Sequence, residues 1–195
     1  MTVATIDLLL ARRSTLAMNL GEPGPDDESL DKILRAGIRV PDHGRTEPWR
    51  IQVLYKDAQR ALAEICVEIF KREHPAAAEV QIEFERKRPQ RSPVLLIVTS
   101  HPKPEKFDKV PEIEQTLSSA AVCQNILIAT EALGYNAQWV TDWLAYHPEV
   151  REALGHQTDT KIIGFIHIGT ASEPPNERPR PDFETIVSEW RPTTT

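Results

Sequence analysis

Cysteine and clustered histidine are scarce in this sequence. There are only two cysteines, Cys66 and Cys123, and they lack the spacing of a metal site. No two of the six histidines have the HxxxH spacing of a helical metal site. We therefore expect no bound metal. We expect both cysteines, which lie within apolar helical patterns, to be buried and reduced thiols in a cytoplasmic protein.

Several motifs that identify common functions are also absent. There is no GxGxxG or GxxxxGK[ST] loop for a phosphate, and no GxSxG elbow for a nucleophilic serine. The net charge is −6 and no long basic run occurs, which argues against nucleic-acid binding. The apolar stretch near the N-terminus is too short to span a membrane, and its charges follow it, unlike those of a signal peptide. We therefore expect no membrane partner.

Hydrophobic periodicity predicts alternating helices and strands. Helices are predicted around residues 6–11, from a cap at Asp26 or Asp27 to about 38, and over 57–73, 76–88, 118–133, 148–154 and 183–190. The helix over 76–88 is charged and is expected to be exposed. Strands are predicted over 51–55, 94–99, 137–140 and 162–168. This order indicates a single domain over residues 1–195, with an α+β or mixed α/β sandwich fold.

Three segments suggest contacts outside a simple core. The helix Ser118–Leu133 is apolar on most faces, which favours a central helix or one shared with a second subunit. The proline-rich tail, about residues 172–195, cannot pack on itself and is expected to wrap a partner. The polar loop Lys103–Pro111 follows a buried strand and is a candidate mobile lid at the mouth of a site.

Three polar clusters are candidate functional groups. They are Arg12-Arg13-Ser14, Arg39 with the loop Pro41–Trp49, and Arg178-Pro179-Arg180. Each also has an ordinary structural interpretation. Cations at a helix end stabilise its dipole, a tryptophan after a proline often anchors a core, and arginines in a polar tail stay solvated.

Five segments occur in an order that resembles the nitroreductase family. They are LLLARRS, LDKILRAGIRVPDHGRTEPWRIQVL, SSAAVCQNILIATEALGYNAQWVT, KIIGFIHIGT and RPRPDFETIV, and together they span nearly the whole chain. The similarity is greatest to small bacterial NAD(P)H nitroreductases of the YdjA-like type. It implies an α+β, three-layer α/β/α sandwich with a central mixed, mostly antiparallel sheet. It also implies a homodimer whose C-terminal arms are exchanged and whose FMN lies at the interface, with NADH or NADPH as reductant.

The resemblance also implies roles for individual residues. Arg12 and Ser14, with Arg13 in the same motif, would hold the FMN phosphate together with Arg178 or Arg180. Further flavin contacts would come from Arg39, His43 and Glu47 of the second subunit, and from Trp139, Val140 and Thr141 beside the flavin ring. Because hydride passes to the flavin itself, no catalytic side chain is expected.

Two positions depart from the family pattern. Leu16 stands where many members have a basic residue near the flavin pyrimidine, so that Arg39 would supply this charge. Glu47 replaces a glutamine and cannot donate as an amide does.

The implied function is ping-pong hydride transfer from NAD(P)H to FMN and on to a nitroaromatic, quinone or similar small acceptor. Two alternatives stay open. One is a different flavin chemistry on the same fold, such as dehalogenation or flavin fragmentation. The other is a non-catalytic flavin-binding or regulatory protein, whose only support is the pair of departures.

Overall fold

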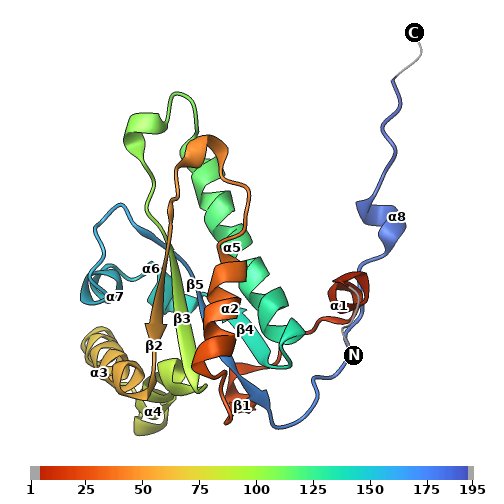
Figure 1. The fold of residues 1–195 in the computed structure, drawn as a ribbon. Helices are drawn as coiled ribbons and strands as arrows, with labels where there is room; N and C mark the ends of the chain where they lie inside the picture. Colours follow the sequence, from red (N-terminus) through yellow and green to blue (C-terminus); the bar gives the residue numbers. More distant parts are fainter. Residues whose placement is uncertain (1–4, 193–195) are drawn as a thin grey trace.

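The computed structural model describes residues 5–192, which form a five-stranded sheet with helices on both faces (Figure 1). The strands are β1 (Leu20–Gly21), β2 (Trp49–Leu54), β3 (Val94–Ser100), β4 (Asn136–Val140) and β5 (Lys161–Ala171). The α-helices are α1 (Thr5–Ala11), α2 (Asp27–Gly37), α3 (Lys56–Glu73), α4 (Glu79–Lys87), α5 (Glu112–Ala132), α6 (Asp142–Tyr146), α7 (Pro148–Ala153) and α8 (Phe183–Ile186). Within this part of the chain, no helix is both long and apolar enough to cross a membrane.

Strand β3 lies at the centre of the sheet, between β2 and β5. Leu96 of β3 is paired with Val53 of β2 on one side and Ile166 of β5 on the other. All seven residues of β3 are buried, which confirms that this unbroken apolar run is a strand covered on both faces. Strands β1 and β4 both pair with β5, and every pairing among the described residues is antiparallel.

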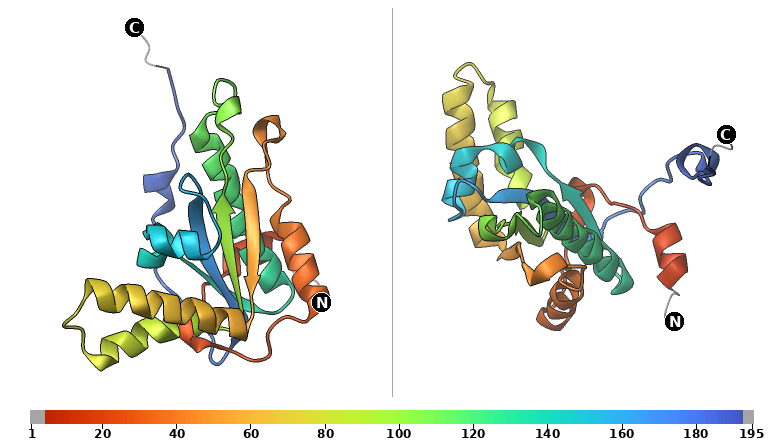
Figure 2. Two further views of the ribbon diagram at one scale, coloured as in Figure 1. Left: turned by 90° about the vertical axis from the view of Figure 1, so that its left-hand side faces the viewer. Right: turned by 90° about the horizontal axis from the view of Figure 1, so that it is seen from above.

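The two faces of the sheet build separate cores. Val94, Leu96 and Val98 of β3 pack with α2 and α5, whereas Leu95 and Ile97 point the other way and pack with α3, α6 and α7. The alternation follows from the two-residue period of a strand. Helices therefore cover both sides of the sheet (Figure 2), and the predicted three-layer α/β/α sandwich is confirmed.

Local signals in the sequence position the two helices on the first face. The Asp26 carboxylate accepts a hydrogen bond from the Ser29 backbone N–H at 2.8 Å and starts α2, as predicted. Gly134, at φ 85°, follows the end of α5, also as predicted. Gly37 lets the helices approach closely, because a Cβ there would lie 2.7 Å from Cγ1 of Ile126.

Several elements differ from the sequence predictions. Helix α5 begins at Glu112 rather than Ser118. The prediction started too late because the first turns of this helix bury polar side chains, Gln115 among them, which an apolar pattern does not reveal. Helix α4 is shorter than predicted and not simply exposed, since Ile82 and Glu85 are buried. Strand β1 and helix α6 were not predicted, and the helix expected over 183–190 is a single turn.

The last part of the chain leaves the sheet as an arm. After β5, residues 172–192 run away from the body, and α1 projects from the same side (Figures 1 and 2). Exposed apolar side chains line both segments: Ile6, Leu9 and Leu10 on α1, and Phe183, Ile186, Val187 and Trp190 on the arm. Residues 193–195, the end of the predicted arm, lie outside the described residues, as do residues 1–4.

Candidate functional site

A cleft of about 460 Å³ lies where the chain after α1 meets the start of the arm. Four arginines line it: Arg12 and Arg13 from the N-terminal segment, and Arg178 and Arg180 from the arm. Ser14 lies between them in the same lining. The structure thus brings together five of the residues that the sequence assigned to one phosphate site. They come from distant parts of the chain: Arg13 forms an ion pair with Glu177 of the arm, 164 residues later in the sequence.

Ion pairs hold two of the arginines and leave the other two uncommitted. Glu177 Oε1 lies 2.8 Å from Arg13 Nη1 and 3.4 Å from Arg180 Nη2. The backbone N–H of Arg178, followed by the Arg13 guanidinium, lowers the pKa of Glu177. Within residues 5–192, no carboxylate lies within ion-pair distance of Arg12 or Arg178. These two guanidiniums can therefore bind an anionic ligand without breaking an existing pair.

The buried side of the cleft carries polar groups that the sequence analysis missed. Gln138 of β4 accepts a hydrogen bond from the Ala17 backbone N–H through Oε1, at 2.6 Å. The Oγ1 of Thr15 is buried and has no hydrogen-bond partner among the described residues. The sequence could have indicated Gln138. Successive side chains of a strand point to opposite faces, so Gln138 faces the side of the sheet opposite to that of its neighbour Trp139.

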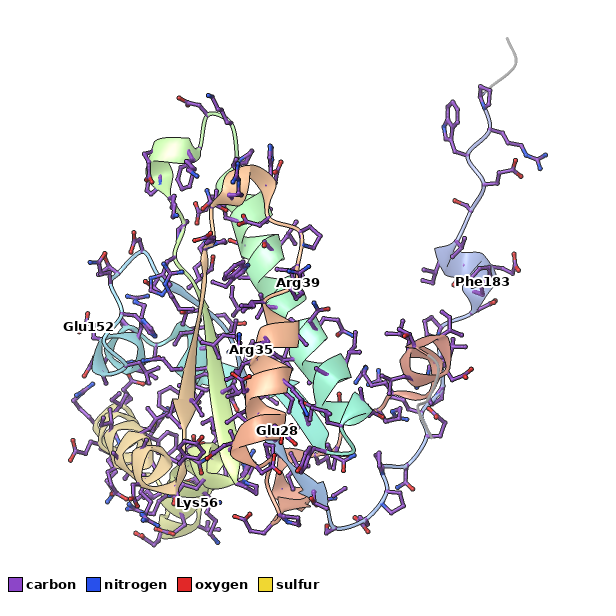
Figure 3. All side chains as sticks on the ribbon, in the orientation of Figure 1. Glu28, Arg35, Arg39, Lys56, Glu152 and Phe183 are labelled. Atoms are coloured by element: carbon purple, nitrogen blue, oxygen red, sulfur yellow. The ribbon has the colours of Figure 1, made fainter. Side chains whose placement is uncertain are left out.

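Arg39, His43 and Glu47 lie elsewhere, beyond the C-terminal end of α2. All three are exposed, and Figure 3 shows Arg39 on the body of the molecule, apart from the arm that carries Phe183. His43 Nδ1 is 2.6 Å from Glu114 Oε2 on α5. A single chain therefore does not bring these residues to its own arginine cleft, and their predicted contact with the flavin of a second subunit stays a prediction.

The loop that carries His43 and Glu47 has an unusual backbone. Arg45 and Glu47 both have positive φ, 50° and 44°, which costs energy for residues other than glycine. The Asp42 carboxylate compensates, because it accepts hydrogen bonds from the backbone N–H groups of Thr46 and Glu47, each at 2.9 Å. These bonds keep the pKa of Asp42 below its usual value despite the opposing effect of its partial burial.

The segment Trp139–Thr141 borders two different environments. The Trp139 indole donates to the Ile163 carbonyl at 3.1 Å and packs with the α2–α5 core, so its side chain does not line the arginine cleft. Val140 and Thr141 instead line a small cavity of about 50 Å³ together with Arg91. Of the three residues assigned to the flavin ring, Val140 and Thr141 therefore line an open space, whereas Trp139 packs in the core.

The candidate lid is attached to its surroundings. Gln115 of α5 accepts from the Lys103 backbone N–H at 2.8 Å and donates to the Val110 carbonyl at 3.2 Å. The Lys106 ammonium donates to the Gly44 carbonyl at 3.0 Å, so the lid lies against the His43 loop. Its mobility stays a prediction, but any opening must break these bonds.

The cysteines match their expected chemistry. Both are free and buried, and burial raises the pKa of each thiol to about 12. A thiol with so high a pKa is a poor nucleophile at neutral pH. Among residues 5–192, no group of three or more histidine, cysteine, aspartate or glutamate side chains could hold a metal ion.

Comparison with known proteins decides the family. Residues 10–170 match the model of the nitroreductase family, which is most of the chain. The chain belongs to the nitroreductase family. It is 36% identical over 169 residues to YdjA of Escherichia coli strain K12, which is named as an NAD(P)H nitroreductase, and the match covers 85% of this chain and 87% of YdjA.

Solved structures show the same fold. A nitroreductase-like family protein of Bacillus cereus superposes with a TM-score of 0.83, covers 96% of both chains and is 19% identical. A nitroreductase of Desulfovibrio desulfuricans, solved in complex with FMN, superposes with a TM-score of 0.71 at 19% identity, covering 98% of this chain and 100% of that one. The family match ends at residue 170, so Arg178 and Arg180 lie beyond it and are placed at the cleft by the structure alone.

Proposed function

We propose that this nitroreductase-family protein is an FMN-dependent oxidoreductase that takes hydride from NADH or NADPH and passes it to a small organic acceptor. The observation that carries the proposal is the cleft in which Arg12, Arg13, Arg178 and Arg180 converge around Ser14. Family membership and the relation to YdjA support the reductant, and the FMN complex of the Desulfovibrio relative supports the cofactor.

The residues of the cleft suit a flavin phosphate. A phosphate dianion is well matched by forked guanidiniums and a hydroxyl donor, which Arg12, Arg178 and Ser14 offer. Arg13 and Arg180 bind Glu177 and so fix the arm as one wall of the cleft. The unpartnered Thr15 hydroxyl and the side chain of Gln138 also line this cleft. The volume of about 460 Å³ lies within the range of small-molecule sites.

The protein supplies binding and electrostatics rather than a nucleophile. FMN, when bound, provides the hydride-accepting centre. Arg39 of the second subunit would place a positive charge beside the flavin pyrimidine, where Leu16 offers none, and would favour the reduced form. The nicotinamide and the acceptor would use the same place in turn, as a ping-pong mechanism requires. The acceptor is a nitroaromatic, a quinone or a related compound.

The exposed arm supports a homodimer. Beyond Arg180, every side-chain hydrogen bond of the described arm stays within the arm itself, while Phe183 and Trp190 are 67% and 82% exposed. Apolar side chains on an extended segment need a surface to cover them. We infer that the arm, about residues 172–195, packs on a second copy of this single-domain chain and completes two FMN sites at the interface. We place the protein in the cytoplasm, where its two free thiols stay reduced.

The test is an anaerobic half-reaction. The purified protein is expected to show the absorption bands of oxidised flavin, and these bands are expected to bleach when NADH or NADPH is added. Restoration of colour by a nitroaromatic or a quinone would establish the second half-reaction. A stable colour that neither nucleotide bleaches would identify a flavin-binding protein instead, and a protein that takes up no FMN would refute the proposal.

A further inference from the structure

The turn that follows β4 has a strained backbone beside the place proposed for the flavin ring. Val140 and Thr141 line the open space there, and Asp142 is the next residue in the same lining. Asp142 has a φ of 59°, a conformation that costs energy for residues other than glycine. Such a turn keeps its shape only where neighbouring groups hold it. The contacts of the Asp142 side chain therefore bear on the geometry of the flavin site.

Both carboxylate oxygens of Asp142 have partners. Oδ1 accepts a hydrogen bond from the Trp143 backbone N–H at 2.7 Å. Oδ2 forms an ion pair with the guanidinium of Arg88, which caps the C-terminal end of α4. The first bond lies within the turn itself, whereas the second joins the turn to a different helix. Helix α4 can therefore set the position of the turn through Arg88.

Arg88 is itself fixed by a second carboxylate. Its Nε and Nη2 each donate to an oxygen of Glu85 at 2.7 Å, and the side chains of Arg88 and Glu85 are only 15% and 7% exposed. Glu85 Oε2 also accepts from the Trp143 indole at 2.8 Å. Burial opposes the charged form of Glu85, but the hydrogen bonds from Arg88 and Trp143 outweigh it and lower the pKa of Glu85. The network therefore stays charged at neutral pH and holds two successive residues, Asp142 and Trp143.

We propose that Arg88 is a positioning residue of the flavin site, which acts through Asp142 to hold Val140 and Thr141 against the flavin ring. The inference rests on the proposed function and adds a residue to that site. A buried ion pair contributes little net stability, because desolvation of the two charges offsets their attraction. The fork of a guanidinium does fix the orientation of the carboxylates that it joins. Hydride transfer depends steeply on such positioning.

Replacement of Arg88 tests the positioning role. In Arg88→Met, reduction of bound FMN at saturating NADH or NADPH is expected to slow about 10- to 100-fold, because the ring loses its aligned support. The absorption bands of the bound flavin are expected to shift. FMN affinity should change little, because Arg88 does not line the arginine cleft. Arg88→Lys keeps the charge and should retain more of the rate than Arg88→Met.

Arg86→Met is the matched control on the same helix. Arg86 is also partly buried and paired, but within the described part of the chain its partners are Glu64 and Glu83 and not the turn after β4. This variant should keep the reduction rate and the flavin spectrum of the parent. Urea unfolding compares the stability of the two variants. If the reduction rate falls equally in both, the role of Arg88 is only structural and the inference is overturned.

Asp142→Asn distinguishes positioning from direct contact with the flavin. Asparagine tolerates a positive φ and can still accept from the Trp143 backbone N–H, but it removes the ion pair with Arg88. Positioning predicts that this variant slows flavin reduction as Arg88→Met does, and that the double variant is no slower than either single one. An unchanged rate in Asp142→Asn, or losses that add in the double variant, would overturn the inference.

The outcomes also separate this inference from the function on which it rests. Flavin reduction in the parent reports the proposed function alone. Equal rates and spectra in the parent and Arg88→Met would overturn the inference and leave the function standing. Hydrogen exchange of the Trp143 backbone amide in the flavin-free protein gives an independent measure, which Arg88→Met should speed and Arg86→Met should not. If neither nucleotide reduces the parent, the flavin spectra and the exchange rates decide, and a parent that takes up no FMN refutes both proposals.

Discussion

At the level of single residues, Arg12 and Arg13 are neighbours in sequence with different surroundings. Arg13 is paired with Glu177, and its side chain is only 17% exposed. Arg12 has no carboxylate within ion-pair distance among residues 5–192, although its charge partly opposes the burial that raises the pKa of Glu131. We therefore predict separate tasks for the two arginines, with Arg12 binding the ligand and Arg13 holding the arm through Glu177.

This difference gives the first prediction. Arg12→Ala is expected to weaken FMN binding by about 2–5 kcal/mol, because it removes a guanidinium from a phosphate dianion in a partly buried site. That is a loss in affinity of about 30-fold to more than 1000-fold. FMN fluorescence on dissociation measures it. Arg178→Ala and Arg180→Ala serve as comparisons and should cost less, because each can substitute for the other. If Arg12→Ala binds FMN as tightly as the parent, Arg12 is only a solvated cation at a helix end.

His167 provides a second prediction at this scale. Its ring, on β5 opposite Gln138 of β4, is buried. Its Nδ1 is 2.9 Å from Ser92 Oγ, which itself donates to the Val94 carbonyl. Nδ1 therefore carries the proton of a neutral ring. Burial, with Arg91 and Lys56, lowers the pKa of His167 to about 3.

The lowered pKa predicts a loss of stability in acid. Between pH 3 and the unfolded value near 6.5, the unfolded chain binds a proton that the folded chain does not. The free energy of unfolding should therefore fall as the pH falls through this window, by up to about 1.4 kcal/mol per unit from this group. In His167→Asn, whose amide can still donate to Ser92, the pH slope from urea unfolding should be smaller than in the parent. Equal slopes in parent and variant would show that His167 does not contribute.

At the level of elements, the contact between β4 and β5 depends on one glycine. Trp139 of β4 lies across Gly164 of β5, where a Cβ would come within 1.9 Å of the indole Nε1. The nitrogen cannot move freely, because it donates to the Ile163 carbonyl. The Trp139 indole therefore holds β4 against β5, and with β4 the side chains of Gln138 and Val140.

Gly164→Ala is expected to displace Trp139 and to lower the free energy of unfolding by about 1–3 kcal/mol, the usual cost of overpacking. Gly21→Ala is the matched control, because nothing lies within 4 Å of a Cβ there and neither glycine has positive φ. Urea unfolding of both variants makes the comparison. A Gly164 variant as stable as the Gly21 variant would show that the indole can shift without cost.

The elements also show what the sequence could predict. The unbroken apolar run of β3 and the caps of α2 and α5 were local signals strong enough to place those elements. The first turns of α5 were missed because Gln115 is a buried polar residue that forms hydrogen bonds with the lid. A hydrophobic pattern does not predict the burial of such a residue. Helix α6 was missed because five residues carry too little periodicity to separate it from a loop.

At the level of the whole molecule, the arm has few contacts with the rest of the chain. Its first residues are attached by the Asn19 amide, which donates to Glu173 Oε1 at 3.1 Å, and by the Arg13–Glu177 pair. Its remainder shows apolar side chains to solvent, as does α1. A second copy of the chain would cover these surfaces.

Removing the arm should therefore affect assembly and cofactor together. A chain that ends at Arg180 keeps all four arginines but lacks the apolar end of the arm. It is expected to sediment as a monomer and to lose most of its FMN, because contacts from the second subunit are lost. The full-length protein should sediment as a flavin-loaded dimer at micromolar concentration. A folded, flavin-loaded monomer of the full chain would contradict the proposed interface.

The sequence located the arginine cleft but not its relation to the other predicted contacts. The motif Arg12-Arg13-Ser14 and the pair Arg178 and Arg180 were found from their resemblance to the family, and the structure brings them together. Glu177, which fixes their geometry, was missed because an acidic residue argues against a phosphate site unless its ion pairs are seen.

The central claim is that this cleft holds the phosphate of FMN, and a comparison of two flavins tests it most directly. Riboflavin carries the same ring and ribityl chain as FMN but no phosphate. Two charge-assisted contacts at about 1.5 kcal/mol each should make the flavin-free protein bind FMN about 100-fold more tightly than riboflavin, and Arg12→Ala should remove much of this difference. Equal affinity for the two flavins, by fluorescence titration, would contradict the assignment of Arg12, Ser14 and one of Arg178 and Arg180 to the phosphate.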